Sequence, residues 1–358
     1  MRSLPVDPRD QHGGAVPLTS VLPVVTQTHS LVPMAPASPL LALLGDGDDL
    51  ERVEAALRTS VETDDADLTE IASHLIRAGG KRLRPACTLV AARTAGAPTS
   101  DDVVLGGVAV ELVHLGSLYH DDVMDEADTR RGIESVNARW GNLTAILAGD
   151  FLLARASEIA ASLGTEVAAL LARTIGKLCE GEVAQLRRAF DPARTEADYF
   201  RSIEGKTASL FSAACRIGGL VAELPRPNVD ALTEWGLAFG MAFQVFDDVL
   251  DLTATEAELG KPTGHDLVEG IYTLPVIRTL AEGGAAADEL RDLLGRPIGG
   301  AELDKALAIV RSGGGVPSAV ETARAYAGNA RAAAVGLGPS SASAALADAA
   351  DALLDSLG

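Results

Sequence analysis

The sequence predicts an all-α protein built as one large helical domain. From Asp48 onward, apolar residues recur three and four positions apart along extended segments, the spacing that gathers them on one face of a helix. Short breaks such as Gly79 with Gly80, and residues 224–227, separate these segments. Alternating β-branched runs bounded by hairpin turns are missing, so an antiparallel sheet has little to be built from. About 310 residues without a clear linker indicate a single domain.

The composition limits the class of partner. The chain has 358 residues, 47% of them hydrophobic, which is enough to bury a large core. Its formal net charge of −20 repels phosphate backbones and anionic lipid head groups, which disfavours nucleic-acid binding as a main role. A phosphate-bearing ligand must therefore meet a local cluster of bases or a metal. Cys87, Cys179 and Cys215 form no C-x-x-C pair, which favours a reduced, cytoplasmic compartment and gives no zinc site.

The N-terminal stretch differs from the rest of the chain. Residues 11–45 contain no Asp, Glu, Lys or Arg, but five prolines interrupt every apolar run before it reaches the ~20 residues of a spanning helix. We interpret residues 1–43 as a disordered, Pro-rich extension and residues 44–358 as the catalytic domain. A weak membrane-associating tail is the alternative for the extension. No later segment is expected to be long and apolar enough to cross a bilayer.

Two helices are predicted to end in aspartate clusters. In the first, over residues 102–126, one apolar stripe is formed by Val108, Leu112, Leu115 and Tyr119. Another face places Asp121 above Asp125, with Asp122 beside them, because 3.6 residues make one turn. The second helix repeats the arrangement, with Gly236, Gly240, Gln244, Asp247 and Asp251 on one face and Asp248 adjacent.

The repetition favours a metal site. A single DDxxD cluster is more simply a solvated, acidic helix end. Here two such clusters end otherwise apolar helices, and closely spaced carboxylates suit Mg²⁺ well. Because Mg²⁺ with few protein ligands typically bridges to substrate phosphates, the sequence predicts a diphosphate held by metal between the two helices.

Basic residues stand where such a diphosphate would need them. Lys81, Arg82 and Arg84 follow two glycines, and Arg130 with Arg131 follows the first aspartates. Arginine offers bidentate geometry to phosphate, although a charged surface loop is an equally good explanation of each cluster alone. Further isolated cations are Lys206 and Lys261. Pairing with Glu204 or another acid is the alternative for Lys206.

These motifs together resemble the trans-isoprenyl diphosphate synthases, also called the polyprenyl synthetase family. The resemblance runs from about Asp49 to the C-terminus. It is carried by GGKRLRP at 79–85, HDDVMDEADTRRG at 120–132, GDFLLARA at 149–156, GKTASLF at 205–211, FQVFDDVLDL at 243–252 and GKPTGHDLVEG at 260–270. It implies an all-α fold of about a dozen helices around a central cavity, and a homodimer.

The resemblance also implies residue roles. The diphosphate of isopentenyl diphosphate would be bound by Lys81, Arg84, His114 and Arg131. The ligands of a cluster of Mg²⁺ ions, three by the family pattern, would be Asp121, Asp122, Asp125, Asp247, Asp248 and Asp251. The allylic diphosphate on that cluster would meet Arg130, Lys206 and Lys261, while Thr207 and Gln244 face the allylic cation. One position departs from the pattern: family members often have Lys where this chain has Ile271.

The expected reaction is a Mg²⁺-dependent prenyl transfer. Metal and cationic side chains stabilise the departing allylic diphosphate, and the double bond of isopentenyl diphosphate attacks the resulting cation. A class I terpene cyclase would not need the GGKRLRP segment as a second diphosphate site. A partner subunit of a two-component synthase would usually lack intact aspartate motifs. A geranylgeranyl diphosphate synthase is a further alternative.

Small residues before the first aspartates favour a long product. Gly116 and Ser117 lie one turn before Asp121, and Val113 lies one turn further, where a growing chain would extend. Family members with short products commonly carry a bulky residue here. We therefore expect a medium or long all-trans polyprenyl diphosphate, of the kind used for quinone side chains. The alternative for Gly116 is that it merely allows close helix packing.

Overall fold

The computed structural model describes residues 39–45, 48–255 and 263–355. The helices of the first half are α1 (Pro39–Leu44), α2 (Asp49–Ser60), α3 (Ala66–Ala72), α4 (His74–Arg77), α5 (Leu83–Arg93), α6 (Asp101–Met124), α7 (Val136–Trp140), α8 (Asn142–Ser162) and α9 (Thr165–Leu186). Those of the second half are α10 (Glu196–Ile203), the π-helix η1 (Glu204–Ala208), α11 (Ser209–Val221), α12 (Arg226–Thr253), α14 (His265–Val268), α15 (Leu274–Glu282), α16 (Gly284–Leu293), α17 (Ala301–Ser312), α18 (Gly315–Gly336) and α19 (Ser341–Asp355).

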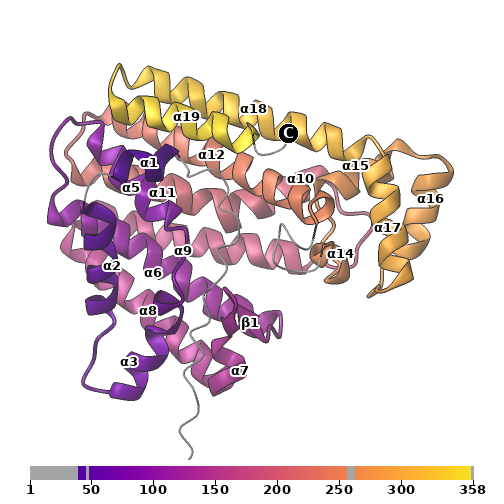
Figure 1. Ribbon diagram of the computed structural model, residues 1–358, viewed down its shortest axis with the longest axis horizontal. Coiled ribbons are helices and arrows are strands. Elements are labelled where there is room, and N and C mark those ends of the chain that lie inside the picture. Colours follow the sequence, from indigo (N-terminus) through magenta and orange to yellow (C-terminus); the bar gives the residue numbers. More distant parts are fainter. Residues whose placement is uncertain (1–38, 46–47, 256–262, 356–358) are drawn as a thin grey trace, which may run out of the picture. The chain divides into compact units, whose positions relative to one another are not determined.

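The predicted all-α class is confirmed (Figure 1). The described part contains one short antiparallel pair, β1 (Thr129–Arg130) with β2 (Ile133–Glu134), in which Thr129 lies opposite Glu134. This hairpin follows the first aspartate cluster along the chain, and its strand β1 carries Arg130.

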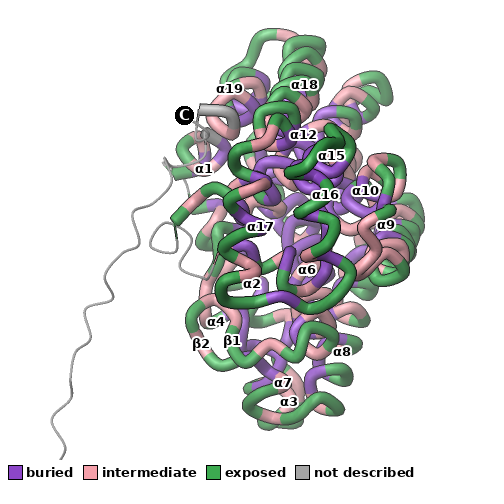
Figure 2. The backbone as a smooth tube through the Cα atoms, turned by 90° about the vertical axis from the view of Figure 1, so that its right-hand side faces the viewer, coloured by how far each residue is buried: buried purple, intermediate pink, exposed green. Residues whose placement is uncertain are grey.

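Helix α6 forms the centre of the core. It packs against α5, α8 and α11, and the predicted stripe of Val108, Leu112, Leu115 and Tyr119 is fully buried. The helix begins after Ser100, whose hydroxyl accepts a hydrogen bond from the Val103 amide at 3.3 Å, as expected of an N-cap. Figure 2 shows the buried positions along α6 and α12, between the exposed outer turns.

Helix α6 also corrects an expectation about membrane spans. By length and hydropathy it is long and apolar enough to cross a bilayer, so the expectation that no such segment follows residue 43 is wrong. Within the protein, however, 72% of its most apolar window is buried. The hydropathy of α6 is therefore that of a core helix.

Glycines bring α12 close to α11 and η1. A Cβ on Gly240 would lie 2.6 Å from the Ala208 Cα atom, and one on Gly236 would lie 2.6 Å from the Phe211 carbonyl oxygen. Larger residues would push the helices apart, because real Cβ atoms do not approach so closely. The face that the sequence places below the second aspartates is thus a helix contact, and it sets Gln244 next to η1.

The predicted start of the folded domain at residue 44 is wrong by about one helical turn. Helix α1 spans Pro39–Leu44, and both Leu40 and Leu44 are fully buried in the same core cluster as α6. It contacts α5 and α19. The pattern was too short to predict a helix from the sequence, because one turn shows no periodicity. The predicted extension is otherwise outside the described residues.

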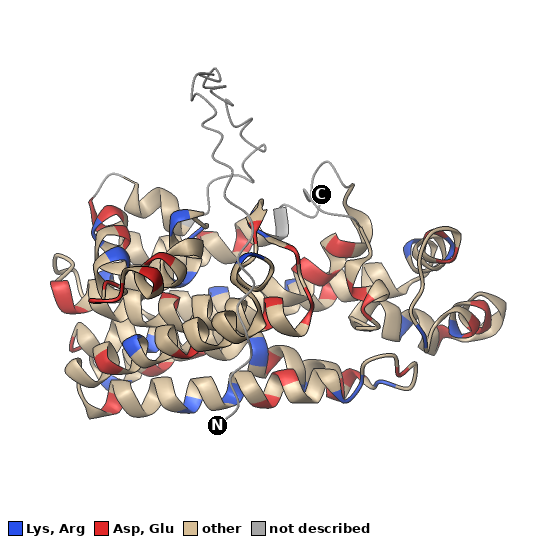
Figure 3. Ribbon diagram, turned by 90° about the horizontal axis from the view of Figure 1, so that it is seen from below, with Lys and Arg blue, Asp and Glu red and all other residues tan. Residues whose placement is uncertain are grey.

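Charged residues are spread over many elements. Basic positions are scattered along the described ribbon and form no continuous stripe (Figure 3).

Candidate active site

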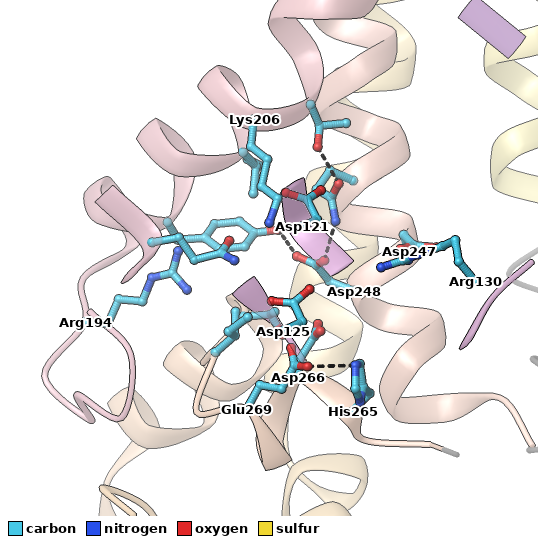
Figure 4. A pocket seen from close by; sticks show the side chains of 17 residues that line it. Asp121, Asp125, Arg130, Arg194, Lys206, Asp247, Asp248, His265, Asp266 and Glu269 are labelled. Atoms are coloured by element: carbon cyan, nitrogen blue, oxygen red, sulfur yellow. Dashed lines mark hydrogen bonds and ion pairs between the residues drawn. The ribbon is translucent and has the colours of Figure 1, made fainter. Parts of the chain in front are cut away.

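The ends of α6 and α12 open onto one polar cavity of about 240 Å³ (Figure 4). Its acidic lining residues are Asp121, Asp125, Asp247, Asp248, Asp266 and Glu269, and its basic ones are Arg130, Arg194, Lys206 and His265. Uncharged lining residues include Tyr199, Ile203, Thr207, Gln244, Ile271 and Thr273. The structure therefore brings the two predicted aspartate clusters together around a single space.

The first cluster is divided between the cavity and the protein interior. Asp121 and Asp125 line the cavity, whereas Asp122 is fully buried and does not line it. The Asp122 Oδ1 atom accepts hydrogen bonds from Arg130, with both the Nε and Nη2 atoms at 2.6 Å. Asp122 is placed to hold Arg130 at the cavity edge, so the prediction that it binds metal gains no support from its position.

The second cluster is divided in the same way. Asp247 and Asp248 line the cavity, but Asp251 is 3% exposed and lies outside the lining. Its Oδ2 atom accepts from the Asp266 amide at 3.3 Å, and its carbonyl oxygen accepts from the Gly264 amide at 2.8 Å. Asp251 thus positions the segment that starts α14, which carries His265, Asp266 and Glu269 into the cavity.

A chain of hydrogen bonds fixes Asp248. Thr207 donates to the Gln244 Oε1 atom at 2.6 Å, and the Gln244 Nε2 atom donates to the Asp248 Oδ1 atom at 2.8 Å. The Tyr199 hydroxyl donates to the other oxygen of Asp248 at 2.5 Å. Burial nevertheless raises the pKa of Asp248 to about 7, against the effect of these two donors. Thr207 and Gln244 both line the cavity and are linked to Asp248 by this chain.

Lys206 reaches the cavity through a π-helical turn. Gly181 on α9 and Gly205 on η1 allow the close approach, since a Cβ on Gly181 would lie 2.5 Å from the Lys206 backbone nitrogen. Single π-helical turns occur frequently at functional sites. The Lys206 Nζ atom pairs with Glu182 at 2.7 Å, which confirms the alternative that it pairs with an acid other than Glu204. Burial opposes its charge, but Glu182 and Asp121 outweigh that effect and raise the pKa of Lys206.

The acids of the cavity exceed the cations available to them. Burial, reinforced by Glu182 and Asp125, raises the pKa of Asp121 to about 6 although Lys206 opposes the shift. Burial and Glu269 raise the pKa of Asp125 as well. A divalent cation in the cavity would relieve this repulsion.

The donor set suits Mg²⁺ bound together with a phosphate ligand. Within the described residues, no three Asp, Glu, His or Cys side chains converge closely enough to hold an ion by themselves. Mg²⁺ commonly takes one or two carboxylates and completes its shell with water and substrate phosphate oxygens. The carboxylates that line the cavity can supply these one or two ligands. The lining therefore fits Mg²⁺ bound together with a diphosphate better than a metal ion held by the protein alone.

A second, basic cluster lies outside this cavity. Burial lowers the pKa of the His114 imidazole, and the charges of Arg84 and Arg131 lower it further. The Arg131 Nη1 atom donates to the Leu75 carbonyl at 3.1 Å and also to the carbonyl of Gly79, in the loop that carries Lys81. The four residues predicted to bind isopentenyl diphosphate therefore gather in one region, and none of them lines the acidic cavity.

Arg82 differs from its neighbours Lys81 and Arg84. Its guanidinium is buried and bonds to Glu54, to Glu111 at 2.8 Å and to the carbonyl of Ile76 at 3.1 Å. Both acids compensate its charge, so Arg82 anchors the loop. Lys81 is exposed, and the Arg84 guanidinium stacks 4.7 Å from the centre of the Phe211 ring.

The predicted chain-length residues do not line the cavity. A Cβ on Gly116 would lie 3.1 Å from the Gly149 carbonyl oxygen and 3.2 Å from Leu153, so this glycine supports close packing of α6 on α8. Val113 is fully buried, and Ser117 is half-buried with its hydroxyl donating to the His114 carbonyl at 2.9 Å. Lys261 lies outside the described residues.

Several lining residues were missed by the sequence analysis. His265, Asp266 and Glu269 stand within the motif at 260–270, and their polarity was a signal that could have been used. Arg194 and Tyr199 belong to no motif, and neither does Glu182, which pairs with the lining residue Lys206. They reach the site only through the packing of α9 and α10 against η1 and α12.

Comparison with known proteins decides the family. The family model described as polyprenyl synthetase matches residues 65–310. The chain belongs to the polyprenyl synthetase family. This membership confirms the predicted enzyme class, a trans-polyprenyl diphosphate synthase, which is a prenyltransferase.

Relatives and solved structures of the polyprenyl synthetase family agree. A nonaprenyl diphosphate synthase of Mycobacterium tuberculosis is 39% identical over 281 residues, 78% of this chain and 84% of the relative. A geranylgeranyl diphosphate synthase of Methanosarcina mazei is 41% identical over 223 residues, 61% of this chain and 68% of the relative. The crystal structure of a decaprenyl diphosphate synthase from Rhodobacter capsulatus superimposes with a TM-score of 0.83 at 36% identity, covering 90% of this chain and all of that one.

A further polyprenyl synthetase structure bears on the ligand. The polyprenyl synthase from Caulobacter crescentus, described as complexed with calcium and isoprenyl diphosphate, superimposes with a TM-score of 0.83 at 35% identity. The match covers 89% of this chain and 98% of that one. A divalent cation and a prenyl diphosphate therefore occur together in a structure of this fold.

The raised pKa of Asp121 predicts a pH-dependent gain in stability for Asp121→Asn without metal. Because the pKa is about 6 in the folded chain and 3.8 ordinarily, folding disfavours the carboxylate, and its cost grows as pH rises from about 4 to 6. Asp121→Asn should raise the free energy of unfolding at pH 8 by at most about 3 kcal/mol, and by less than half of that at pH 4.5. Urea unfolding in EDTA measures both, with the exposed Asp128→Asn as control. An equal effect at the two pH values would contradict the assignment.

Proposed function

We propose that this chain catalyses the Mg²⁺-dependent head-to-tail condensation of isopentenyl diphosphate with an allylic diphosphate. The product is a medium or long all-trans polyprenyl diphosphate of the kind attached to quinones, made in the cytoplasm. One observation carries the proposal: an acidic cavity suited to a metal–diphosphate complex and a separate basic cluster suited to a metal-free diphosphate occur in the same chain.

The two regions divide the substrates between them. Asp121, Asp125 and Asp247 would hold Mg²⁺, three ions by the family pattern, and when bound this metal would screen the negative charge of the allylic diphosphate. Arg130 and Lys206 add positive charge at the rim of the same cavity. The basic cluster of Lys81, Arg84, His114 and Arg131 would hold isopentenyl diphosphate, whose charge needs no metal there.

The chemistry of the remaining residues follows from their fixed positions. As the allylic C–O bond breaks, its electron pair leaves with the diphosphate, and Lys206 and Arg130 stabilise the growing charge. The carbocation would face the oxygens of Thr207 and Gln244, which the hydrogen-bond chain to Asp248 holds in place. The double bond of isopentenyl diphosphate then forms the new C–C bond, and a proton passes to the released diphosphate.

The competing functions explain less of the structure. A terpene cyclase has one diphosphate to bind and leaves the basic cluster without a role. A non-catalytic partner subunit leaves the acidic lining of the cavity without a role. A geranylgeranyl diphosphate synthase would use both regions in the same way, so only product size separates it from the proposal.

An exposed apolar face supports a homodimer. Leu143, Ile146 and Leu147 on α8 are 73%, 41% and 58% exposed, and their spacing puts them on one side of the helix. A second copy of this face would cover it. Leu147→Glu should therefore shift the molar mass measured by light scattering from a dimer towards the 36.9 kDa monomer, whereas the exposed Val335→Glu on α18 should not. A wild-type monomer would contradict the proposal.

The activity test combines product analysis with three variants. Purified protein, isopentenyl diphosphate, an allylic primer and Mg²⁺ should yield prenyl diphosphates longer than geranylgeranyl. Asp121→Ala and Asp247→Ala should lower kcat by orders of magnitude because diphosphate departure loses its electrostatic stabilisation. Lys81→Ala should mainly raise the KM for isopentenyl diphosphate.

Three results would oppose the proposal. Cyclic products would support the terpene cyclase, and near-normal turnover of Asp121→Ala would sink the metal assignment. A change confined to the allylic KM in Lys81→Ala would mean that the two substrate sites are reversed.

Product length is tested on α6. We propose that the chain grows past Ser117, whose side chain is half-buried and leaves the same helix one turn before Asp121. Ser117→Phe should shorten the products without abolishing condensation, since Asp121 and Asp125 are untouched. Chromatographic sizing measures this, with Ser117→Thr as the small control. An unchanged product distribution would show that the chain takes another route.

A further inference from the structure

We propose that Arg194 is a further substrate-binding residue, which contacts the allylic diphosphate from the wall of the cavity formed by residues 271–273. This inference rests on the proposed function and adds a residue that belongs to none of the sequence motifs. It assigns to Arg194 the positive charge that family members often place at the position of Ile271.

Arg194 is buried, and it does not use all its donors. The residue is 4% exposed. Its Nη1 atom donates to the Tyr272 carbonyl at 3.1 Å, and its Nη2 atom donates to the Ser202 hydroxyl at 2.6 Å. The buried Nε–H group has no hydrogen-bond partner. A guanidinium carries five N–H donors, so several remain for a ligand that enters the cavity.

The charge of Arg194 also lacks a direct counter-charge. Within the described residues no carboxylate forms an ion pair with it, whereas Arg82, the comparably buried arginine of the α5 loop, has both Glu54 and Glu111. The guanidinium lies 5.6 Å from the centre of the Tyr199 ring. Burial lowers the pKa of Arg194 and outweighs the opposing charges of Asp248 and the other acids around it. A guanidinium stays protonated in spite of this, and a buried unpaired charge is costly unless a ligand neutralises it.

The position of Arg194 relates it to Ile271. Both residues line the cavity, and the carbonyl that Arg194 binds belongs to the residue directly after Ile271. Figure 4 shows Arg194 among the side chains that line this cavity. A cation anchored on this segment lies where a lysine side chain at position 271 would begin. The guanidinium can therefore supply phosphate contacts at this wall, with a bidentate geometry that lysine lacks.

A purely structural role is the competing explanation. Arg194 does connect the segment before α10 to the segment before α15, through Ser202 and Tyr272. Such a role needs hydrogen bonds but no charge. It leaves unexplained why a buried guanidinium beside a phosphate-sized cavity has no ion pair within the described residues and an unused Nε–H group. Charge is thus the property that the experiment must isolate.

The test separates the two substrates kinetically. Arg194→Met should raise the KM for the allylic diphosphate at least tenfold and leave the KM for isopentenyl diphosphate within about twofold, because only one of the two sites loses a contact. Calorimetry should give a correspondingly weaker Kd for inorganic diphosphate in Mg²⁺. Arg187→Met, at an exposed arginine of the same segment, should change neither value.

A second-site variant tests whether Arg194 supplies the positive charge that a lysine at position 271 would supply. Adding Ile271→Lys to Arg194→Met should restore most of the lost allylic affinity, which a structural explanation does not predict. If Arg194→Met does not fold, Arg194→Gln serves instead, since its amide can still donate to the Tyr272 carbonyl.

Three outcomes would overturn the proposed role of Arg194. Equal changes in both KM values, a fall in Tm with unchanged KM values, or no rescue by Ile271→Lys would assign Arg194 to structure alone. Absence of condensation by the wild-type protein would overturn the proposed function instead, and the calorimetric comparison would still decide whether Arg194 binds diphosphate.

Discussion

Burial of carboxylates around one cavity, reinforced by their mutual repulsion, is the main electrostatic demand that this fold has to meet. Asp121, Asp125, Asp247 and Asp248 share one cavity, and the pKa values of Asp121 and Asp248 rise to about 6 and 7. An arrangement that resists its own ionisation must be held by other interactions. The apolar bodies of α6 and α12 provide them, since both helices are packed in the core along most of their length. The fold thus stabilises a site that is incomplete without a cation and an anionic ligand.

The separation of charges explains how a chain of net charge −20 can bind two diphosphates. The acidic cavity would accept a diphosphate only with metal, whereas the cluster around His114 concentrates the positive charges of Arg84 and Arg131. Arg82 and Arg84 stand two positions apart but serve differently. Arg82 is neutralised by Glu54 and Glu111, which leaves Lys81, Arg84 and Arg131 as the charges available to a ligand.

The sequence predicted the helices and their buried faces better than the directions of individual side chains. Periodicity was sufficient for α6 and α12, because long amphipathic patterns report which face is buried. Spacing could not distinguish Asp121 from Asp122, since adjacent residues lie 100° apart and the rotation of α6 is set by α5, α8 and α11. For the same reason Asp251 was expected in the cavity, although the start of α14 covers it.

Other parts of the site have no local signal at all. Arg194 meets the carbonyl of Tyr272, 78 residues away, and Lys206 meets Glu182 across the contact of α9 with η1. From the sequence, Gly116 could either leave room for a growing product chain or allow close helix packing. Its contact with Leu153 on α8, which the structure shows, supports close packing. Such pairings arise from tertiary packing, which a single sequence does not encode in a readable pattern.

A calorimetric titration can show whether the acidic cavity binds diphosphate only together with Mg²⁺. Inorganic diphosphate is titrated calorimetrically into the metal-free protein, once in EDTA and once with millimolar Mg²⁺, and Mg²⁺ is titrated alone. We expect weak or no heat from diphosphate alone or from Mg²⁺ alone, and saturable binding when both are present. The cavity carboxylates repel the free anion and do not form a complete metal site by themselves. Diphosphate binding of equal strength in EDTA would contradict the central claim.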